Sequence, residues 1–495
     1  MTMMSVRNAA AWAIASQYTS FAILFVTSVV LARWFITPAD LGLFSIAFAA
    51  VSLISFLQDF GITRYINGER DLTPEKIQTA FSVSAVFAFA VAVVALLAAW
   101  PIAWFYADAR LLPITLVVAG SYLMIPFAVV PQALCQRKLD YRSNTMIEVG
   151  SAAANATIAV ILAMRGHGAL ALAWGAFAQQ FARMAVAQWR AGGMLPWPLR
   201  FDGTAPIVAI GKTNSVSAVC YAIVLRAPEL LIGRTLGTVA TGLFSRAAGL
   251  ALQLRLLVAG AVTGVFYPAF RVVRDRGEPL GPPYLRVVGA YTGIAWPAMA
   301  GIAALAWPLV DILYGQVWLA AAPLLLWVAL AQLCYVSVPL NEDLPILLNR
   351  MPQLIRRNVF DTVLSVSLLA LAAPFGLEWV AISRFVHGLC WIALYAPFIK
   401  GLLGFSWRDL AGVWSKSAVV TAAAIAPVLL TFGLWRSPQD VGVGLVLALV
   451  LTGVACWLAA LRITRHSLLS ELLAVLSDLL SARRSAPAPL PGSAE

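Results

Sequence analysis

The stretch AAAWAIASQYTSFAILFVTSVVLA (9–32) decides the fold class, because it carries no charged side chain along its whole length. A helix needs about 20 consecutive apolar residues to cross a bilayer. A cleaved signal peptide has a shorter apolar core, which a small-residue cleavage site follows. We therefore expect residues 10–32 to form a transmembrane helix and not a signal peptide.

The rest of the chain repeats this pattern. Of its 495 residues, 61% are hydrophobic and only 11% are charged, whereas soluble proteins carry about 25% charged residues. Spanning segments must be helices or closed barrels, and the long, continuous apolar runs favour helices. We predict an all-α polytopic membrane protein with about fourteen transmembrane helices, at 10–32, 41–57, 79–100, 112–133, 145–164, 168–188, 207–232, 240–266, 285–310, 319–339, 358–374, 379–399, 414–434 and 441–461.

The basic residues indicate the orientation of these helices. Most Lys and Arg residues outside the helix interiors fall in alternate loops, and the opposite loops hold only Arg33, Arg110, Arg165, Arg226, Arg234 and Arg436. Because cytoplasmic loops carry an excess of Lys and Arg, we predict a bacterial inner-membrane protein with both termini in the cytoplasm. The net charge of +12 then lies along a membrane boundary, and nucleic-acid binding, which needs one basic solvated face, is not expected.

A short repeat suggests two halves. GLFS occurs at 42–45 and at 242–245, and each copy begins an apolar span after an Arg, Arg33 or Arg234, that ends the previous one. The offset of six helices keeps both copies in one orientation, so we predict two parallel six-helix bundles. The expected domains are an N-terminal bundle (1–200), a C-terminal bundle (201–400), two extra transmembrane helices (401–465) and a cytoplasmic tail (466–495).

The tail itself has two parts. The segment SLLSELLAVLSDLL (467–480) places its leucines on one helical stripe with Ser, Glu and Asp opposite. This pattern is typical of an amphipathic helix that lies on a membrane surface, and coiled-coil or partner binding is the alternative. The remaining residues are of low complexity, and we expect them to be disordered.

Several segments resemble a known family. They are VLARWFITPADLGLFSIAFAAVSLISFLQDFGITRYI (30–66), NGERDLTPEKIQTAF (67–81), QRKLDYRSNTMIE (136–148), ELLIGRTLGTVATGLFSRAAGLALQ (229–253), VFYPAFRVVRD (265–275) and YGQVWLAAAPLLL (314–326). They resemble the polysaccharide, or Wzx-type, flippase branch of the multidrug/oligosaccharidyl-lipid/polysaccharide exporter superfamily. The resemblance runs from residue 1 to about residue 400. Pro228-Glu229 departs from it, because an unbroken polar turn with Asp is expected there.

The resemblance implies a function and its partners. Such proteins move a lipid-linked oligosaccharide, usually on undecaprenyl pyrophosphate, between leaflets by alternating access, for surface polysaccharide or lipopolysaccharide biosynthesis. The implied partners are this cargo, membrane lipids and the machinery of polysaccharide synthesis and export. A cation-coupled drug exporter of the same superfamily is the alternative, but the acids expected for organic cations are scarce in the helices of the first bundle, which offer only Asp59 and Glu148, both near the inner ends of their helices.

An enzymatic function is not expected. The chain has no P-loop and no H-E-x-x-H motif, and its five cysteines are scattered, without metal-site spacing. We therefore expect no cofactor, no metal and no catalytic residues. A membrane polysaccharide polymerase is disfavoured as well, because the loops on the predicted outer side are short, whereas such enzymes need long functional loops.

An anionic cargo needs cations inside the membrane, and Arg255 is the best candidate for this role. It lies mid-way along the expected helix 240–266, where an Arg costs about 2.5–3.5 kcal/mol and therefore usually faces a cavity. Arg246 lies nine residues earlier, on the opposite face at 100° per residue. Snorkelling to a headgroup or pairing with Glu229 is the alternative for both arginines.

Other polar residues within or beside the spans complete the candidate set. Further candidates for the substrate cavity are Lys212, Arg226, Gln17 and Arg64, and candidates for gating or coupling are Asp59, Glu229 and His387. Ordinary roles compete with each of these interpretations. Lys212 can snorkel to a phosphate, Gln17 can hydrogen-bond between helices, and a lone His among apolar residues is usually structural.

Overall fold

The computed structural model describes residues 6–55, 62–69, 71–193 and 198–469. These residues form helices and no strand, so the all-α prediction is confirmed. The helices, in chain order, are α1 (Val6–Trp34), α2 (Pro38–Ser55), α3 (Ile62–Gly68), α4 (Pro74–Phe105), α5 (Leu111–Ser121), η1 (Tyr122–Met124), α6 (Ile125–Arg137), α7 (Tyr141–Met164), α8 (Ala169–Ala191), α9 (Ala205–Thr235), α10 (Gly237–Asp275), α11 (Gly281–Ala304), α12 (Ala306–Tyr314), η2 (Gln316–Ala321), α13 (Ala322–Tyr335), α14 (Asp343–Leu347), α15 (Met351–Ala372), η3 (Ala373–Phe375), α16 (Leu377–Leu403), α17 (Trp407–Leu434) and α18 (Val443–Ile463).

The number of spanning helices is the part of the prediction that stays open. Among the described residues, 12 helices are long and apolar enough to cross a membrane, which establishes a multi-pass integral membrane protein. The two expected spans outside this set coincide with α8 and α10. These helices have 23 and 39 residues, and at about 1.5 Å per residue both exceed a bilayer core of about 30 Å. The count of fourteen therefore stays a prediction.

The chain forms two compact units. The first comprises Met1–Gly249, Leu309–Leu325 and Pro352–His387, and the second comprises Leu250–Pro308, Leu326–Met351 and Gly388–Glu495. Each unit takes segments from distant parts of the sequence. Some unit boundaries fall inside helices, as in α10 and α16. The predicted domain borders at residues 200 and 400 stay a prediction.

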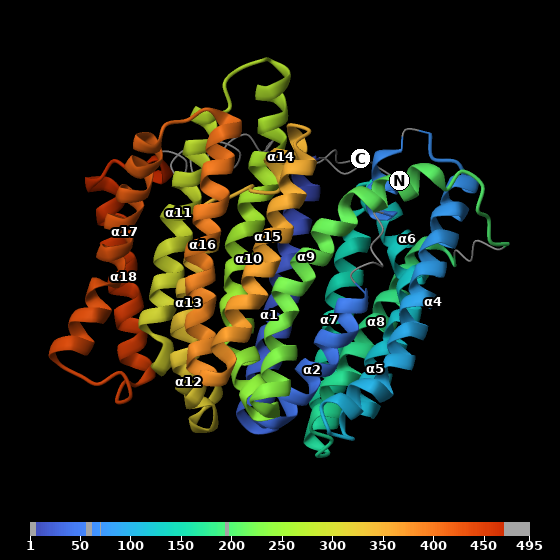
Figure 1. Ribbon diagram of the computed structural model, residues 1–495, viewed down its shortest axis with the longest axis horizontal. Coiled ribbons are helices and arrows are strands. Elements are labelled where there is room, and N and C mark those ends of the chain that lie inside the picture. The colour runs from blue at the N-terminus through green and yellow to red at the C-terminus, as the bar shows by residue number, and fades with distance from the viewer. Residues whose placement is uncertain (1–5, 56–61, 70, 194–197, 470–495) are drawn as a thin grey trace, which may run out of the picture. The chain divides into compact units, whose positions relative to one another are not determined.

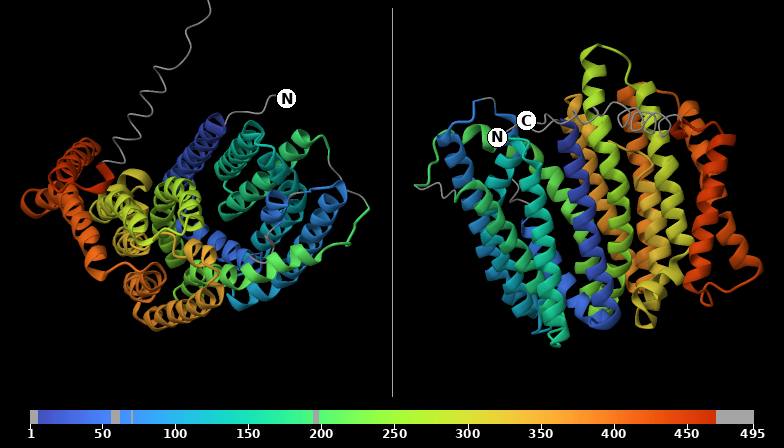
Figure 2. Two further views of the ribbon diagram at one scale, coloured as in Figure 1. Left: turned by 90° about the horizontal axis from the view of Figure 1, so that it is seen from above. Right: turned by 180° about the vertical axis from the view of Figure 1, so that it is seen from behind.

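In the first unit, α7 packs against both α1 and α8, and α5 packs against α4 and α8 (Figures 1 and 2). Small residues permit this close packing. A Cβ atom added to Gly175 of α8 would lie 2.8 Å from the Cβ of Ala159 on α7. Small residues at helix interfaces are the usual means of helix association in lipid, where no hydrophobic force drives helices together.

The repeated GLFS motif marks a contact between α2 and α10. A Cβ atom on Gly42 would lie 1.8 Å from the backbone oxygen of Thr238, and one on Gly242 would lie 1.8 Å from that of Pro38. The two contacts are equivalent, because each glycine follows the matching Pro or Thr by four residues. The two copies of the motif thus meet each other, and only glycine leaves space for this approach.

In the second unit, α17 packs between α11 and α18 (Figures 1 and 2). The end of α18 is anchored by His466, which is 3% exposed. Its Nδ1 accepts a hydrogen bond from the backbone N–H of Leu468 at 3.2 Å. Nε2 therefore carries the ring proton and donates a hydrogen bond to Ser417 Oγ at 3.1 Å. Ser417 Oγ lies 2.8 Å from Thr292 Oγ1 on α11, which donates to Val288 O at 2.7 Å.

Local sequence explains where several helices begin. Thr73, followed by Pro74 at the first helical position, caps α4, and its side chain accepts from the backbone N–H of Lys76. Asp140 caps α7 in the same way, and Ser406 with Asp409 forms a capping box at α17. Such caps satisfy backbone donors that have no partner in the first turn.

Candidate functional site

Arg255 of α10 lies in the second unit and is half-buried. Its Nε atom is buried and has no hydrogen-bond partner among the described residues. Tyr291 of α11 is within electrostatic range of its charge, and no acid among the described residues forms an ion pair with it. A guanidinium with unused hydrogen-bonding capacity is suited to bind a phosphate, which planar Arg contacts in a bidentate way.

Arg246, on the same helix, lies in the first unit, and its guanidinium has several protein contacts although its Nε, like that of Arg255, has no hydrogen-bond partner among the described residues. Its guanidinium lies over the rings of Tyr314 and Trp318, at 4.8 and 5.0 Å from their centroids. It also donates to the side chain of Ser28 on α1. With 9% of its surface exposed, Arg246 connects α10 to α1 and to the 309–325 segment, an arrangement that favours a structural role over cargo binding.

Glu229 and Arg226 lie one turn apart on α9. The guanidinium of Arg226 is 5.0 Å from the ring centroid of Phe48 on α2, and its Nε has no hydrogen-bond partner among the described residues. Glu229 is 9% exposed, and its Oε2 is likewise without a hydrogen bond to any described residue. Arg226 and Arg384 are both within electrostatic range of this carboxylate, so two cations act on Glu229.

His387 does not lie alone in an apolar environment. Its Nε2 is 3.1 Å from Asp361 Oδ1 of α15, and the imidazole is 0% exposed. One turn earlier on α16, Arg384 donates to Ser365 Oγ at 2.9 Å and to Ser365 O at 2.8 Å. These residues, with Glu229, form a buried polar cluster within the first unit. Buried ionisable residues are rare inside membranes and usually mark functional sites.

Asp361 is the cluster member that the sequence analysis did not include. It lies inside the expected span 358–374, and an acid at such a position was the available signal. Glu148, the other acid considered in the first half, is neutralised by its neighbours. Arg183 Nη2 lies 2.9 Å from it, and Gln132 donates to it at 2.8 Å.

The remaining candidates are placed only in part. Gln17 is exposed on α1. Lys212 and Arg64 belong to the backbone of α9 and α3, while their side chains lie outside the described part of the structure. Asp59 lies entirely outside it, as does most of the amphipathic segment 467–480.

Comparison with known proteins places the chain in a family. Residues 30–323 match the family described as polysaccharide biosynthesis protein. The chain belongs to this family. It is 25% identical to the succinoglycan biosynthesis transport protein ExoT of Rhizobium meliloti (strain 1021), over 98% of this chain and 97% of that one. It is 23% identical to the lipopolysaccharide biosynthesis protein WzxC of Escherichia coli (strain K12), over 81% and 83% of the two chains.

Solved structures share the fold of this polysaccharide biosynthesis protein. The lipid II flippase MurJ in an inward closed conformation aligns with a TM-score of 0.69 and 10% identity, over 92% of this chain and 98% of that one. An inward-facing multidrug transporter of the MATE family aligns with a TM-score of 0.57 and 16% identity, over 79% and 96% of the two chains. These structures show that the chain shares the fold of the MurJ and MATE transporters, while the family match and the relatives ExoT and WzxC confirm the predicted polysaccharide branch. The relatives are transporters, not enzymes.

Proposed function

We propose that the protein flips a lipid-linked oligosaccharide, carried on an undecaprenyl-pyrophosphate type of lipid, across the bacterial inner membrane by alternating access. The observation that carries this proposal is the relationship to ExoT, a succinoglycan transport protein, over nearly the full length of both chains. In this proposal both termini are cytoplasmic, and the protein works beside the enzymes that build and export the polysaccharide.

The proposal assigns the phosphate-binding role to Arg255. A pyrophosphate that crosses the membrane must exchange water for protein donors, because an unpaired charge in hydrocarbon is costly. Arg255 offers a half-buried guanidinium with an unused Nε and no acid as an ion-pair partner among the described residues. Arg226 of the first unit, whose Nε is also unused, is the alternative candidate for this role.

The buried cluster on α9, α15 and α16 is assigned to coupling. Glu229 has an oxygen without a hydrogen bond to any described residue and lies within electrostatic range of two cations, and His387 Nε2 lies 3.1 Å from Asp361 Oδ1. A buried acid in this setting can change its charge during a transport cycle. This assignment makes the cluster a gate or coupling element and leaves cargo contact to the arginines.

Reconstitution into liposomes tests the function directly. A fluorescent undecaprenyl-pyrophosphate-linked oligosaccharide is placed in both leaflets, and a membrane-impermeant reagent quenches only the outer pool. The wild-type protein should make the protected pool accessible, whereas protein-free liposomes should keep it protected. Efflux of an organic cation such as ethidium, with no movement of the glycolipid, would support the drug-exporter alternative and reject the proposal.

A further inference from the structure

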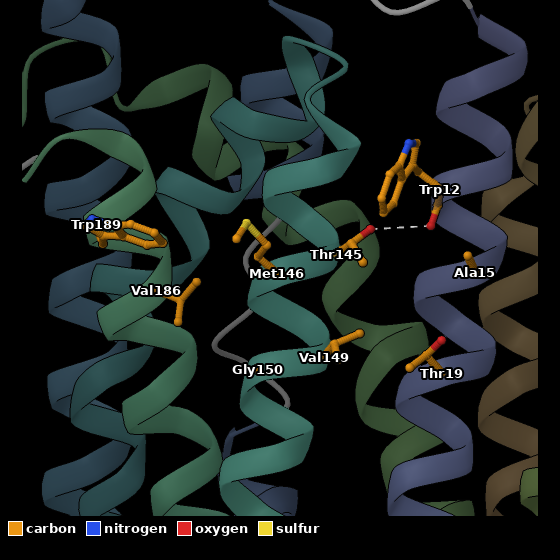
Figure 3. A pocket seen from close by; sticks show the side chains of 9 residues that line it. All are labelled: Trp12, Ala15, Thr19, Thr145, Met146, Val149, Gly150, Val186 and Trp189. Carbon is orange, nitrogen blue, oxygen red and sulfur yellow. Dashed lines mark hydrogen bonds between the residues drawn. The ribbon is translucent and has the colours of Figure 1, made fainter.

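An apolar groove opens on the surface of the first unit, between α1, α7 and α8 (Figure 3). Its volume is 440 Å³, and its lining is almost wholly apolar. Trp12 of α1 and Trp189 of α8 lie on either side of Met146 of α7 in this view. All three side chains are exposed, at 42%, 68% and 38% respectively, so the groove is accessible from outside the bundle.

The floor of the groove is open because of one glycine. A Cβ atom added to Gly150 of α7 would first meet Val186 Cγ2, at 3.8 Å, so a larger side chain there would enter the groove. The polar atom of Thr145 does not alter its apolar character. Its hydroxyl donates to Tyr141 O in its own helix at 2.8 Å and lies 3.4 Å from Trp12 O of α1, the contact drawn in Figure 3. The groove therefore suits a hydrocarbon chain.

Basic residues lie at one end of the groove. Arg142 is exposed and lies one turn before Met146, on the same face of α7. Arg190 lies next to Trp189 and holds its guanidinium 5.7 Å from that ring. Among the described residues Arg142 makes no ion pair, while Arg190 is 3.9 Å from Asp140, the residue that caps α7. Two cations and one acid leave a net positive charge at this end.

We propose that this groove binds the polyisoprenoid tail of a phosphate-headed lipid, with the phosphate at Arg142 and Arg190. The choice of an isoprenoid lipid rests on the proposed function. The combination of one apolar recess and adjacent cations matches a lipid with one hydrocarbon chain and one phosphate head. A diacyl phospholipid has two chains, and this single recess accommodates only one. In lipid, such binding depends on close van der Waals fit, which the two indole rings and the flexible Met146 provide.

Binding is measured by native mass spectrometry of the purified full-length protein, with undecaprenyl phosphate as the probe and phosphatidylglycerol as the comparison. Gly150→Leu should weaken retention of undecaprenyl phosphate about threefold to tenfold, because it fills the floor. Arg142→Gln should weaken retention of undecaprenyl phosphate about fivefold, because one cation near an anionic head group contributes about 1 kcal/mol to binding. Gly120→Leu on α5 is the matched control, since its first contact is also a side-chain carbon at 3.8 Å. It should retain the probe like the wild type.

Two results would overturn the inference. One is a wild-type protein that does not retain undecaprenyl phosphate. The other is equal retention of phosphatidylglycerol with equal loss in the variants, which would show a surface for ordinary membrane lipids. Arg142→Gln replaces an exposed residue, so it tests the site even if Gly150→Leu fails to fold. Because no transport is measured, a wild type that retains the probe but flips no glycolipid contradicts only the proposed function.

Discussion

Arg255 and Arg246 lie on one helix, yet their surroundings differ. Both have a buried Nε without a hydrogen-bond partner among the described residues, but only the guanidinium of Arg246 is also held by two aromatic rings and Ser28. We expect Arg255→Ala to lower glycolipid flipping about tenfold to a hundredfold, since a hydrogen bond to a charged group contributes about 1.5–3 kcal/mol. Arg255→Lys should keep part of the activity, because the charge remains but the two-pronged contact is lost. The quenching assay in liposomes measures both.

The comparison requires equal amounts of folded protein in the membrane. Arg255→Ala should melt within a few degrees of the wild type, since no described ion pair is broken. Normal flipping by Arg255→Ala would assign Arg255 a snorkelling or interhelical role and would make Lys212 or Arg226 the next candidate. Equal activity of Arg255→Ala and Arg255→Glu would remove the main support for an anionic cargo.

Arg246 should show the opposite pattern. Arg246→Ala removes two cation–π contacts, each contributing up to about 2 kcal/mol when shielded from water, and a hydrogen bond to α1. We expect a clear fall in melting temperature and in membrane abundance, while the flipping rate per folded molecule stays near the wild-type rate. Fluorescence-detected size exclusion after heating measures the stability. A stable Arg246→Ala variant without activity would transfer the cargo role to this residue.

At the residue scale, the sequence located charged side chains inside the expected spans but not the residues that contact them, and their roles stay a prediction. Mid-span Arg255, Arg246, Glu229 and His387 were recognisable because charge inside a membrane is rare. The partner of His387 could not be recognised from the sequence, since Asp361 lies 26 positions away and only helix packing brings the two together. The rings of Tyr314 and Trp318, which contact Arg246, belong to the segment 309–325. The periodicity of α10 gives no information about a segment so distant in sequence. Sequence periodicity gives the face of a helix but not the residues that cover it.

At the element scale, the contact between α2 and α10 gives a sharp expectation. Gly42→Ala should destabilise the protein by about 3 kcal/mol or more, the upper range for overpacking, because the new Cβ would lie 1.8 Å from a backbone oxygen. Gly249→Ala, on α10 with no atom within 4 Å of its added Cβ, is the control. It should be neutral or slightly stabilising, since Ala favours helix by about 1 kcal/mol over Gly. Thermal melting in detergent compares the two.

The anchor of α18 should make stability depend on pH. Burial, and then the nearby Lys416, lowers the pKa of His466 below its usual value of 6.5, and protonation of Nδ1 would break its hydrogen bond from Leu468. The unfolded chain then binds the proton more readily than the folded protein. This contribution is therefore fully present above about pH 6.5 and is lost as the pH falls through the lowered folded-state pKa.

A melting series from pH 8 to pH 5 tests this expectation. The wild type should lose more stability over that range than His466→Ala, which lacks the titrating group. The difference between the two proteins isolates His466 from all other titrating groups. Parallel curves would show that the anchor does not depend on the protonation of His466.

For the whole molecule, composition was sufficient to predict an all-α polytopic membrane protein, and the resemblance of segments such as 30–66 predicted the family and its transport function. Few charges and long apolar runs follow directly from lipid as the solvent, and the GLFS repeat proved to be a physical contact between α2 and α10. The division into units was less accessible. Segments such as 309–325 and 352–387 belong to the first unit, although they lie in the second half of the sequence, because units are defined by three-dimensional packing.

The orientation of the whole molecule in the membrane is the last expectation. The turns at Lys138 and Arg165 lie at opposite ends of α7, and the distribution of basic residues places the first in the cytoplasm. Reporter fusions at Lys138 and Arg274 should therefore be cytoplasmic, and fusions at Arg110, Arg165 and Arg436 periplasmic. The side of the membrane that each fusion reports tests the helix count, because one missing or extra span would move every later site to the opposite side. In particular, α8 and α10 must either both cross the membrane or both fail to cross it for Lys138 and Arg274 to share a side. If only one of them crosses, Arg274 becomes periplasmic while Lys138 stays cytoplasmic, and the prediction of two parallel bundles fails.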